Sequence, residues 1–395
     1  MRGSQLRVGI VGFGWMGQVH ARSYTRLRQH YLDAPLQPVL VAVADNAADT
    51  RLASAVQAFG FGDVHADWRE MIARDDIDLV SITGPNFIHR DVAVAAAEAG
   101  KHIWIEKPAG RHADETRDIR DAVVAAGVQS AAGFNYRNAP AIELARQLIT
   151  DGRLGEIEHV GIRLLADYSA HPEGALSWRF INEWSGSGVL GDLVSHGVDL
   201  GRFLIGEISE LVCDSAIFIP ERPQASAAAS HFSRGAGGPL GPVENEDYVS
   251  ALLRFDALSE TGSSSTGVRG MLESSRVAVG EQCTYGIEVH GRRGALAWDF
   301  RRMGELRLCL DQDYQNASYV TRYVAPGDGE LINFQPGSGI AMGYDDLKVI
   351  EAHRLVQSIA TGQPVGATIH DALKAAEIVD AMAESAKTRS WITLR

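Results

Sequence analysis

The sequence is short of cysteine, of long apolar runs and of basic charge. Its 395 residues contain only three cysteines, Cys213, Cys283 and Cys309, an odd number without C-x-x-C spacing. This spacing offers neither a disulfide framework nor a structural zinc site, and we expect no metal in the chain. The apolar runs are far shorter than the ~20 residues of a membrane-spanning helix, so we also expect no membrane contact.

The charge balance excludes another class of partner. Asp and Glu outnumber Lys and Arg by 50 to 37, and the formal net charge of -13 repels nucleic acid. The one local cluster of arginines, Arg292, Arg293, Arg301 and Arg302, is typical of a solvated strand-turn face. The first residues lack the charged, apolar and small-residue order of an export signal, so we expect a cytoplasmic protein with small, neutral partners.

What is present is an ordinary globular composition, with 45% hydrophobic and 22% charged residues and enough length for two domains. From Leu6 to Gln129, short apolar stretches alternate with Ala-rich amphipathic ones, which predicts a doubly wound parallel sheet. Beyond about Tyr136, alternating stretches separated by Gly-rich turns predict a mostly antiparallel sheet. We therefore expect an α/β protein, with an N-terminal Rossmann domain over residues 1–135 and a C-terminal α+β domain with a large open sheet over residues 136–395.

The pattern also gives expected elements. In the first domain the expected strands are Leu6 to Val11, Val39 to Ala44, Leu79 to Thr83, His102 to Ile105 and Val128 to Ala132, with helices from Trp15, Asp49, Asp67, Phe87 and Ala113. In the second, helices are expected at Ala139 to Thr150, Val189 to Ile205, Asp345 to Thr361 and His370 to Ala386, and strands at Glu158 to Ala166, Leu211 to Ile219, Tyr248 to Phe255, Arg276 to Val279, Gly286 to His290 and Ala295 to Phe300. The stretch from Pro220 to Asn245, rich in Ala, Ser, Gly and Pro, is interpreted as a lid or an oligomer arm.

A glycine-rich turn, GFGWMG, follows the first apolar strand and opens a helix. In this context Gly12 permits the tight turn, Gly14 lets the backbone approach a pyrophosphate, and Gly17 allows the helix to pack closely on the strand. The free N–H groups of the helix N-terminus add a partial positive charge. The turn therefore predicts a dinucleotide site. Its intervening residues, which we include in that site, are Phe13, Trp15 and Met16.

Asp45 ends the second strand, where a carboxylate accepts hydrogen bonds from the ribose hydroxyls. The interval from Gly17 to Asp45 exceeds the usual ~20 residues, and the stretch QHYLDAPLQP accounts for the excess. The negative charge of Asp45 repels a 2'-phosphate and favours NAD over NADP, although Arg51 keeps NADP open. A glycine turn with an Asp cap and no ligand is the alternative.

Two further segments lie at expected carboxyl ends of strands, GPNFIH at Gly84 to His89 and EKP at Glu106 to Pro108. Ligands of open α/β sheets bind at that edge. The side chains expected to face a nicotinamide are Asn86, His89, Glu106 and Lys107. Pro108 disfavours helix at Lys107, and a partly desolvated lysine there can donate to a substrate hydroxyl or assist its deprotonation. A surface lysine before a turn is the alternative.

A third segment, GDLVSHGVD, places Asp192 and His196 four residues apart on one face of an expected helix. A carboxylate that orients an imidazole raises its basicity and suits it to take a proton near neutral pH. A plain surface contact between the two side chains is the alternative. A metal site of Asp192, His196 and Asp199 would lack an H-E-x-x-H pattern, and we do not expect one.

Together these segments resemble the glucose-fructose oxidoreductase, inositol dehydrogenase and rhizopine-catabolism (Gfo/Idh/MocA) family of sugar and cyclitol dehydrogenases, over nearly the whole chain. The resemblance rests on GFGWMG with His20 behind it, Asp45, Pro85 to His89, EKP with Lys107, GFNYR at Gly133 to Arg137, SWRF at Ser177 to Phe180, and Asp192 with His196. It implies a Rossmann domain followed by an α/β domain whose sheet forms a homodimer or homotetramer, with NAD(H) or NADP(H) between the domains. One departure is Gly84, because the family has a β-branched or hydroxyl residue before the P-N pair. The cofactor contact there is expected to run through the backbone or to be loosened.

The resemblance also implies roles. His196 is implied as general base toward the oxidised hydroxyl, Asp192 as the group that orients it, and Lys107 as the group that polarises the oxygen. The candidate cofactor residues are Gly12, Phe13, Gly14, Trp15, Met16, Gly17, Asp45, Thr83, Gly84, Asn86, His89, Glu106, Lys107 and Asn135. The candidate substrate contacts are Lys107, Tyr136, Arg137, Asp167, Tyr168, Arg179, Asp192 and His196, whereas Trp178 is expected to pack.

The finer likeness concerns substrate. SWRF, the IPERP segment and the GYDDLK segment resemble those of inositol and levoglucosan dehydrogenases and related glycoside 3-dehydrogenases. We therefore expect reversible oxidation of a secondary hydroxyl on a neutral sugar, anhydrosugar or cyclitol. Two alternatives are a glycosidase whose bound NAD is reduced and reoxidised in each turnover, and a non-catalytic sugar or dinucleotide sensor. Sensors in this family tend to lose the lysine or the histidine, and both are present here.

Overall fold

The computed structural model describes residues 4–46, 50–224, 238–256, 267–310 and 313–394, and these form two compact units. The first unit contains Met1–Asn135 together with Gly343–Lys374, and the second contains Tyr136–Met342 together with Ala375–Arg395. Sequence alone assigned everything after residue 135 to one domain. The units differ from that expectation because Gly343–Lys374 packs with the first of them.

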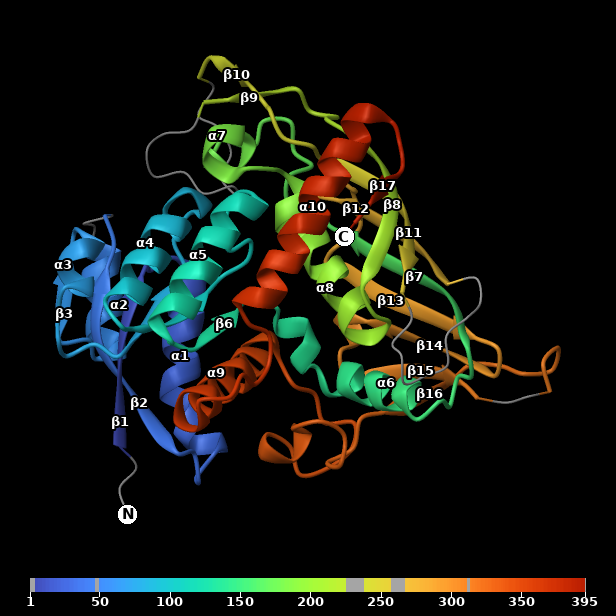
Figure 1. Ribbon diagram of the computed structural model, residues 1–395, viewed down its shortest axis with the longest axis horizontal. Coiled ribbons are helices and arrows are strands. Elements are labelled where there is room, and N and C mark those ends of the chain that lie inside the picture. Colours follow the sequence, from blue (N-terminus) through green and yellow to red (C-terminus); the bar gives the residue numbers. More distant parts are fainter. Residues whose placement is uncertain (1–3, 47–49, 225–237, 257–266, 311–312, 395) are drawn as a thin grey trace. The chain divides into compact units, whose positions relative to one another are not determined.

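The first unit is built on a six-stranded parallel sheet in the order β3-β2-β1-β4-β5-β6 (Figure 1). Its strands are short and apolar, and all four residues of β4 are buried, as expected where helices cover both faces. The elements are β1 (Ser4–Val11), α1 (Trp15–His30), β2 (Leu36–Ala44), α2 (Thr50–Phe59), β3 (Asp63–His65), α3 (Trp68–Ile72), β4 (Leu79–Ile82), α4 (Asn86–Glu98), β5 (His102–Ile105), α5 (Ala113–Ala126) and β6 (Ser130–Ala132). This is the doubly wound Rossmann order predicted from the sequence.

The strand order reverses between β1 and β4. The chain leaves β1 toward β2 on one side and leaves β4 toward β5 on the other, so right-handed crossovers put α1 and α4 on opposite faces. Ligands of such folds bind at the carboxyl ends of the strands where the order reverses, which here are β1 and β4. The glycine-rich turn follows β1 at this point, and Thr83 follows β4.

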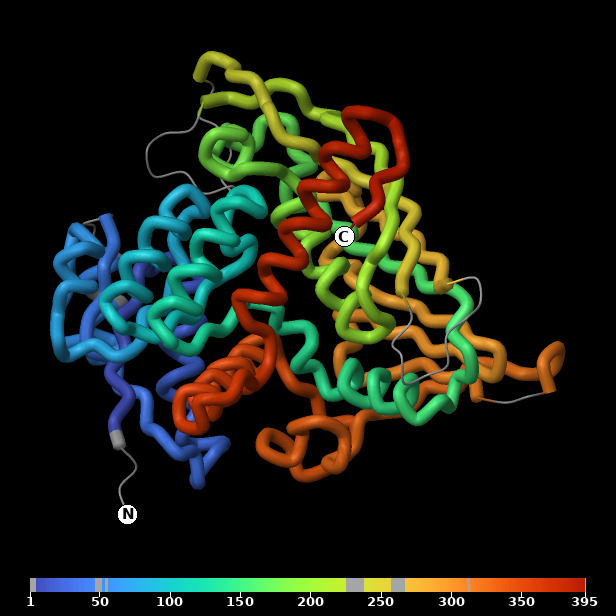
Figure 2. The backbone as a smooth tube through the Cα atoms, in the orientation of Figure 1, coloured from blue at the N-terminus to red at the C-terminus, as the bar shows by residue number. Residues whose placement is uncertain are grey.

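A late helix, α9 (Tyr344–Thr361), packs on α1. Figure 2 shows it in orange-red beside the blue N-terminal helix, although more than 300 residues separate the two in the sequence. Two ion pairs fix the contact, from Arg22 to Asp345 and from Arg26 to Asp346. The next helix, α10 (Ile369–Thr388), continues from the first unit into the second.

The second unit is built on a nine-stranded sheet in the order β16-β15-β14-β13-β7-β12-β11-β8-β17. Every neighbouring pair is antiparallel except β7 and β12, so the predicted large, mostly antiparallel sheet is confirmed. The strands are β7 (Ile157–Leu165), β8 (Ile208–Ala216), β9 (Glu221–Pro223), β10 (Leu240–Pro242), β11 (Tyr248–Phe255), β12 (Val268–Ser275), β13 (Thr284–Gly291), β14 (Gly294–Asp299), β15 (Glu305–Cys309), β16 (Val320–Tyr323) and β17 (Ile392–Thr393). The helices are η1 (Asn135–Asn138), α6 (Pro140–Thr150), η2 (Trp178–Phe180), α7 (Asn182–Ser185), η3 (Leu190–Val194), α8 (Ser195–Leu204), η4 (Phe300–Arg302) and η5 (Leu331–Asn333).

One face of this sheet is covered by α8. Along β11 every second residue is buried, from Val249 to Phe255, which gives the sheet one apolar face. A β-carbon on Gly197 would lie 2.5 Å from the Leu164 side chain of β7, and one on Gly201 would lie 3.1 Å from Ile162. The two glycines therefore let α8 lie close on the sheet, and this fixes the helix that carries His196.

Some predicted elements were wrong or incomplete. No strand covers Arg276 to Val279, because the Arg276 guanidinium turns inward to Asp247 and the strand ends before it, at Ser275. The sequence also did not reveal the short strands β3, β15, β16 and β17, which carry too few residues for a period to show. It also missed the central strand β12, which precedes the strand expected at Arg276 to Val279. Of the insertion at 220–245, the flanks pair as β9 and β10, and residues 225–237 lie outside the described residues. Within the described ranges, no helix combines the length and apolar character needed to cross a membrane.

Candidate active site

The glycine-rich turn after β1 has the geometry that a phosphate cradle needs. Gly12 has φ +86°, and a β-carbon there would lie 2.6 Å from the backbone of Gly84. A β-carbon on Gly17 would lie 2.2 Å from the Gly12 carbonyl oxygen, so both positions exclude a side chain. Gly14 differs: no described atom lies within 4 Å of its ideal β-carbon, and it is the N-cap of α1. Space is therefore left beside the helix N-terminus, where a pyrophosphate is expected to bind.

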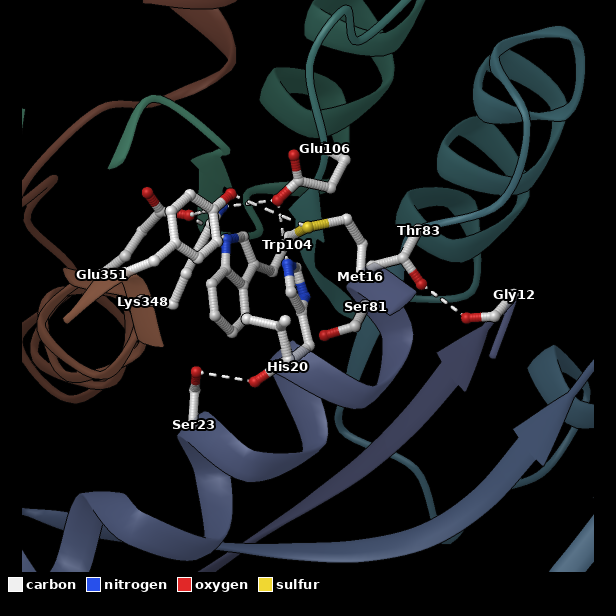
Figure 3. A network of polar contacts seen from close by, with 12 residues as sticks. Gly12, Met16, His20, Ser23, Ser81, Thr83, Trp104, Glu106, Lys348 and Glu351 are labelled. Atoms are coloured by element: carbon white, nitrogen blue, oxygen red, sulfur yellow. Dashed lines mark hydrogen bonds and ion pairs between the residues drawn. The ribbon is translucent and has the colours of Figure 1, made fainter. Parts of the chain in front are cut away.

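Side chains from neighbouring strands hold this turn. The Thr83 hydroxyl donates to the Gly12 carbonyl at 2.6 Å (Figure 3), and the Asp45 carboxylate accepts from the Phe13 N–H at 2.6 Å. The Phe13 ring is buried. Trp15 is 64% exposed and stacks on Tyr344, with ring centroids 5.3 Å apart. Asp45 thus stands at the predicted place, with one oxygen anchoring the turn. The Arg51 side chain, on which the NADP alternative rested, lies outside the described residues.

Asn135 supplies an independent indication of a polar binding site. Its side chain is fully buried, and neither its amide nitrogen nor its amide oxygen has a hydrogen-bond partner among the described residues. Buried polar atoms are rarely left unpaired, so the site fits a polar ligand near the end of β6. A free cradle at Gly14, a carboxylate at Asp45 and an unpaired amide at Asn135 together fit a nicotinamide dinucleotide.

His89 joins the two segments that follow β4 and β5. Its Nε2 and Nδ1 atoms lie 2.9 Å from the carbonyl oxygens of Gly84 and Pro108, and its side chain is buried. Burial lowers the pKa of His89 despite these two carbonyls, so the ring is neutral and donates to one of them. The structure therefore gives His89 the task of tying the PN and EKP segments together. Asn86, 8% exposed, begins α4 beside it.

Glu106 points into the protein. Its Oε1 atom accepts from His20 at 3.0 Å and from Lys348 at 2.5 Å, and the residue is 7% exposed (Figure 3). The sequence predicted that Glu106 faces the nicotinamide, whereas the structure engages this oxygen with the protein's own side chains. Lys107 follows directly and is half-buried, and its bond to Pro108 is cis.

In the second unit, Asp192 lies in a π-helical turn, η3, that runs directly into α8. The Tyr168 hydroxyl donates to its Oδ2 atom at 2.5 Å, and Arg179 lies 3.9 Å from Oδ1. Burial, with the Asp192 charge, raises the pKa of Tyr168, so its phenol stays protonated and acts as a donor. The sequence predicted one continuous α-helix here. A π turn widens the helix at Asp192, a feature that recurs at functional sites.

His196 begins the buried face of α8 and is 6% exposed. Its ring lies 4.5 Å from the Tyr136 ring, centroid to centroid. Tyr136 in turn contacts a cluster of aromatic rings, with centroid distances of 5.0 to 6.3 Å to Phe300, Tyr285 and Trp298. The imidazole is therefore held against an aromatic wall, which restricts its orientation.

Glu246 caps the helix that carries these groups, and the sequence gave no indication of it. Its Oε1 atom accepts from the backbone N–H groups of Gly188 and Leu190, each at 2.8 Å. Burial raises the pKa of Glu246, against the pull of these two N–H groups. A carboxylate placed on free N–H groups stabilises a helix N-terminus. Glu246 is 50 residues or more away in sequence, so no local cap signal could reveal it.

One of the expected substrate residues, Arg137, is engaged by the protein itself. Arg137 is buried, and its Nε atom donates to Asp199 of α8 at 2.7 Å, with a second contact from Nη2 to the same carboxylate. The structure therefore uses Arg137 to fix α8. Asp167 is half-buried in a turn after β7. Among the described residues, no group of three or more His, Cys, Asp and Glu is arranged to hold a metal ion.

Comparisons with known proteins cover nearly the whole chain. Residues 6–134 match the model of an oxidoreductase family with an NAD-binding Rossmann fold, and residues 142–297 match the GFO/IDH/MocA C-terminal domain. A levoglucosan dehydrogenase from Pseudarthrobacter phenanthrenivorans is 36% identical over 98% of this chain and 97% of its own length. An inositol 2-dehydrogenase from Rhizobium meliloti is 29% identical over 90% of this chain and 97% of its own.

A solved structure gives the same result. A levoglucosan dehydrogenase in complex with NADH and levoglucosan aligns with a TM-score of 0.88 at 35% identity, covering 99% of both chains. Fold, glycine cradle and sequence identity over nearly full length agree. The chain belongs to the Gfo/Idh/MocA family of oxidoreductases, and its first unit is an NAD-binding Rossmann fold.

Proposed function

We propose that this protein is an NAD-dependent dehydrogenase that oxidises a secondary hydroxyl of a sugar, anhydrosugar or cyclitol. The observation that carries the proposal is the set of reactive groups. Lys107 follows β5 at the carboxyl edge of the sheet of the first unit. In the second unit, Asp192 lies in η3 and His196 lies four residues later, at the start of α8. A lysine, a carboxylate and an imidazole supply what alcohol oxidation needs from a protein, namely a base and a cation that stabilises the developing alkoxide.

The chain's own residues handle the proton. In the proposed reaction the His196 imidazole takes the proton from the substrate hydroxyl oxygen, and the Lys107 ammonium lies against that oxygen and stabilises its negative charge. Asp192 holds the imidazolium that forms. Tyr168 and Arg179, which contact the Asp192 carboxylate, keep that carboxylate oriented.

Bound NAD supplies the acceptor for the hydride that leaves the same carbon, so the alcohol loses two electrons and two hydrogens and one proton is released. The residues that would hold NAD are those of the cradle, Gly12 to Gly17, with Asp45 at the end of β2 and Asn135 after β6. The carboxylate of Asp45 favours the ribose diol over a 2'-phosphate.

A neutral, cyclic polyol fits the surroundings of His196. Tyr136, Tyr285 and Phe300 present aromatic rings, and sugar rings place their C–H faces on such rings while their hydroxyls take polar contacts. The levoglucosan and inositol dehydrogenases to which the chain is similar act on rings of this kind by name. We propose an anhydrohexose or a cyclitol as the first substrates to examine.

The test is a spectrophotometric scan of cyclitols, hexoses, glycosides and anhydrosugars with NAD and with NADP. The proposal predicts sugar-dependent NADH formation, faster with NAD than with NADP. Net glycoside cleavage without net NADH would favour the NAD-dependent glycosidase. Binding of NAD and sugar without either reaction would favour a sensor and would overturn the proposal.

We also propose that the protein is a homodimer or homotetramer joined through the nine-stranded sheet. Leu252 and Met271 are direct neighbours on β11 and β12 and are 52% and 54% exposed on that sheet. Light scattering during gel filtration tests this, since charged substitutions at both positions should yield monomers. A cytoplasmic location stays a prediction.

A further inference from the structure

Five side chains of the first unit form a closed polar network behind the EKP segment (Figure 3). His20 comes from α1, Trp104 and Glu106 from β5 and the residue after it, and Lys348 and Glu351 from α9. Lys348 is fully buried, and its Nζ atom lies 2.5 Å from Glu106 Oε1 and 2.9 Å from Glu351 Oε1. The Trp104 N–H donates to the same Glu351 oxygen at 2.6 Å.

The protonation states follow from the contacts. Burial would lower the pKa of Lys348, but Glu106 and Glu351 outweigh it and raise the pKa, so Lys348 is a cation. Burial would raise the pKa of Glu106, yet Lys348 and His20 hold it well below its usual value. Burial lowers the pKa of His20 to about 4, with Lys348 adding to the effect, so the ring is neutral. Glu106 can only accept, so the His20 proton sits on Nε2, and Nδ1 has no partner among the described residues.

Fold stability does not explain this arrangement. A buried ion pair is often no more stable than well-packed apolar side chains of similar volume, because desolvation offsets the attraction. Its advantage is geometric, since a charge that must be paired admits few alternative positions. The network therefore fixes where the Glu106 carboxylate lies.

That position is transmitted to Lys107. The Glu106 N–H donates to Ile82 of β4 at 2.9 Å, and the Gly133 N–H donates to Ile105 at 2.9 Å. A β-carbon on Gly133 would lie 2.7 Å from Glu106 Oε2, so the carboxylate also rests against the end of β6. Hydrogen bonds and close contacts therefore hold both the backbone and the side chain of Glu106, and Lys107 is the next residue in the chain.

We propose that Lys348 and Glu351 are positioning residues for Lys107. Lys348 holds Glu106 as an anion with a neutral His20 on the same oxygen, and Glu351 holds Lys348, so that α9 sets the peptide from which Lys107 extends. The inference rests on the proposed function only in taking Lys107 as the group that meets the substrate oxygen.

The arrangement makes one specific consequence unavoidable. His20 is neutral because burial disfavours its charged form and because Lys348 already neutralises Glu106. Without Lys348, the imidazole is the remaining described side chain on this carboxylate oxygen that can carry a positive charge, so we expect the pKa of His20 to rise. The titratable groups around His20 and Glu106, from all elements packed against them, are Tyr24 on α1, His89 on α4, and Lys348 and Glu351 on α9.

The experiment uses Lys348→Met in the full chain, with two readouts. The first is histidine NMR of the protein with and without NAD, in which the His20 signal is assigned by its loss in His20→Asn. We expect His20 to be neutral across the neutral pH range in the native protein and to titrate within it in Lys348→Met. The second readout is kcat as a function of pH. In Lys348→Met, kcat should fall on the order of a hundredfold, and its pH profile should show an additional ionisation. The double variant Lys348→Met with His20→Asn should lack this additional ionisation. The KM for sugar and the Kd for NAD should change less than about threefold.

Lys101→Met is the matched control. Lys101 is also buried and directly precedes the first residue of β5. Its ammonium donates to the backbone carbonyls of Arg74 and Ile77. Its loss should lower stability without changing kcat or the His20 signal. An unchanged His20 signal and an unchanged kcat in Lys348→Met would overturn the proposal.

A second variant covers the case in which Lys348→Met does not fold. Glu106→Gln with Lys348→Met removes the buried Glu106–Lys348 ion pair, so it should fold, and we expect kcat to stay low because Glu106 is no longer held in place. Native kcat in this variant would overturn the proposal. Should no sugar be oxidised by the native protein, the proposed function fails while the NMR titration still decides the network.

Discussion

The two units hold their reactive groups by different means. In the first, Lys107 follows a carboxylate that is held by the Lys348 cation and by the neutral His20 ring. In the second, His196 lies against the Tyr136 ring, and its helix is capped by Glu246. Charges set the direction of the lysine, whereas shape and helix capping set the direction of the imidazole. The first arrangement is therefore the more sensitive to pH, and the second to changes of side-chain volume.

The largest expected effect comes from Lys107→Ala. Loss of the cation that stabilises the alkoxide should lower kcat on the order of 10²- to 10⁴-fold, while the Kd for NAD, which depends on the glycine cradle, changes little. Steady-state NADH formation and calorimetric titration with NAD measure the two quantities. Lys374→Ala, at an exposed lysine of α10, is the control. Unchanged turnover in Lys107→Ala would remove the lysine from the mechanism.

The next effect separates structure from substrate binding at Arg137. Arg137→Met leaves Asp199 buried without its guanidinium, and we expect a loss of roughly 3–5 kcal/mol in the free energy of unfolding. Arg146→Met is the control, because Arg146 lies exposed over the ring of Phe203. Denaturant unfolding measures both. A raised KM for sugar with native stability would return Arg137 to the substrate contacts that the sequence suggested.

Glu351→Gln tests the buried charged network of the first unit through the pH dependence of stability. Burial raises the pKa of Glu351 from 4.5 to about 7, in spite of Lys348. Below pH 4.5 the Glu351 carboxyl is protonated in both the folded and the unfolded chain. Above pH 4.5 the unfolded chain releases this proton first, so the free energy of unfolding decreases as the pH rises through 7. The shift in pKa corresponds to a decrease of roughly 3 kcal/mol in the free energy of unfolding. Glu351→Gln should lack this decrease, because its side chain does not ionise.

Unfolding at several pH values between about 5 and about 8 measures this difference. The control is Glu207→Gln, because Glu207 is an exposed carboxylate paired with Arg202 in the second unit. Parallel stability curves for the native protein and Glu351→Gln would mean that Glu351 ionises normally.

The smallest effect tests the second unit. Tyr168→Phe removes the O–H donor from Asp192 and keeps the ring, so kcat/KM should fall about tenfold, which corresponds to about 1.4 kcal/mol. Tyr248→Phe on β11 serves as the control. A loss as large as that of Lys107→Ala would instead make Tyr168 a direct participant in the proton transfer.

Much of the fold was predictable, because its signals are local. Strand and helix periods gave the Rossmann order, and the glycine turn gave the cradle at Gly12. Asp192 and His196 became candidate site residues because they are four residues apart in the sequence. Tyr168 was expected to touch substrate, and the structure adds its bond to Asp192.

What the sequence could not give are the contacts between distant segments. Lys348 is more than 240 residues from Glu106, and Glu246 more than 50 from the helix it caps. The one signal for the network was a lysine and a glutamate three residues apart, Lys348 and Glu351, among the apolar residues of α9. A charged pair within an apolar helix face predicts a buried partner, but not which one.

The most direct test of the account is single-turnover NADH formation from one sugar or cyclitol in four proteins: the native chain, Lys107→Ala, His196→Asn and the double variant. We predict NADH in the native protein, large losses in each single variant, and a loss in the double variant close to that of the more damaging single one, because the two groups serve one proton and hydride transfer. Losses that multiply, or no NADH from the native protein with any sugar or cyclitol, would contradict the account.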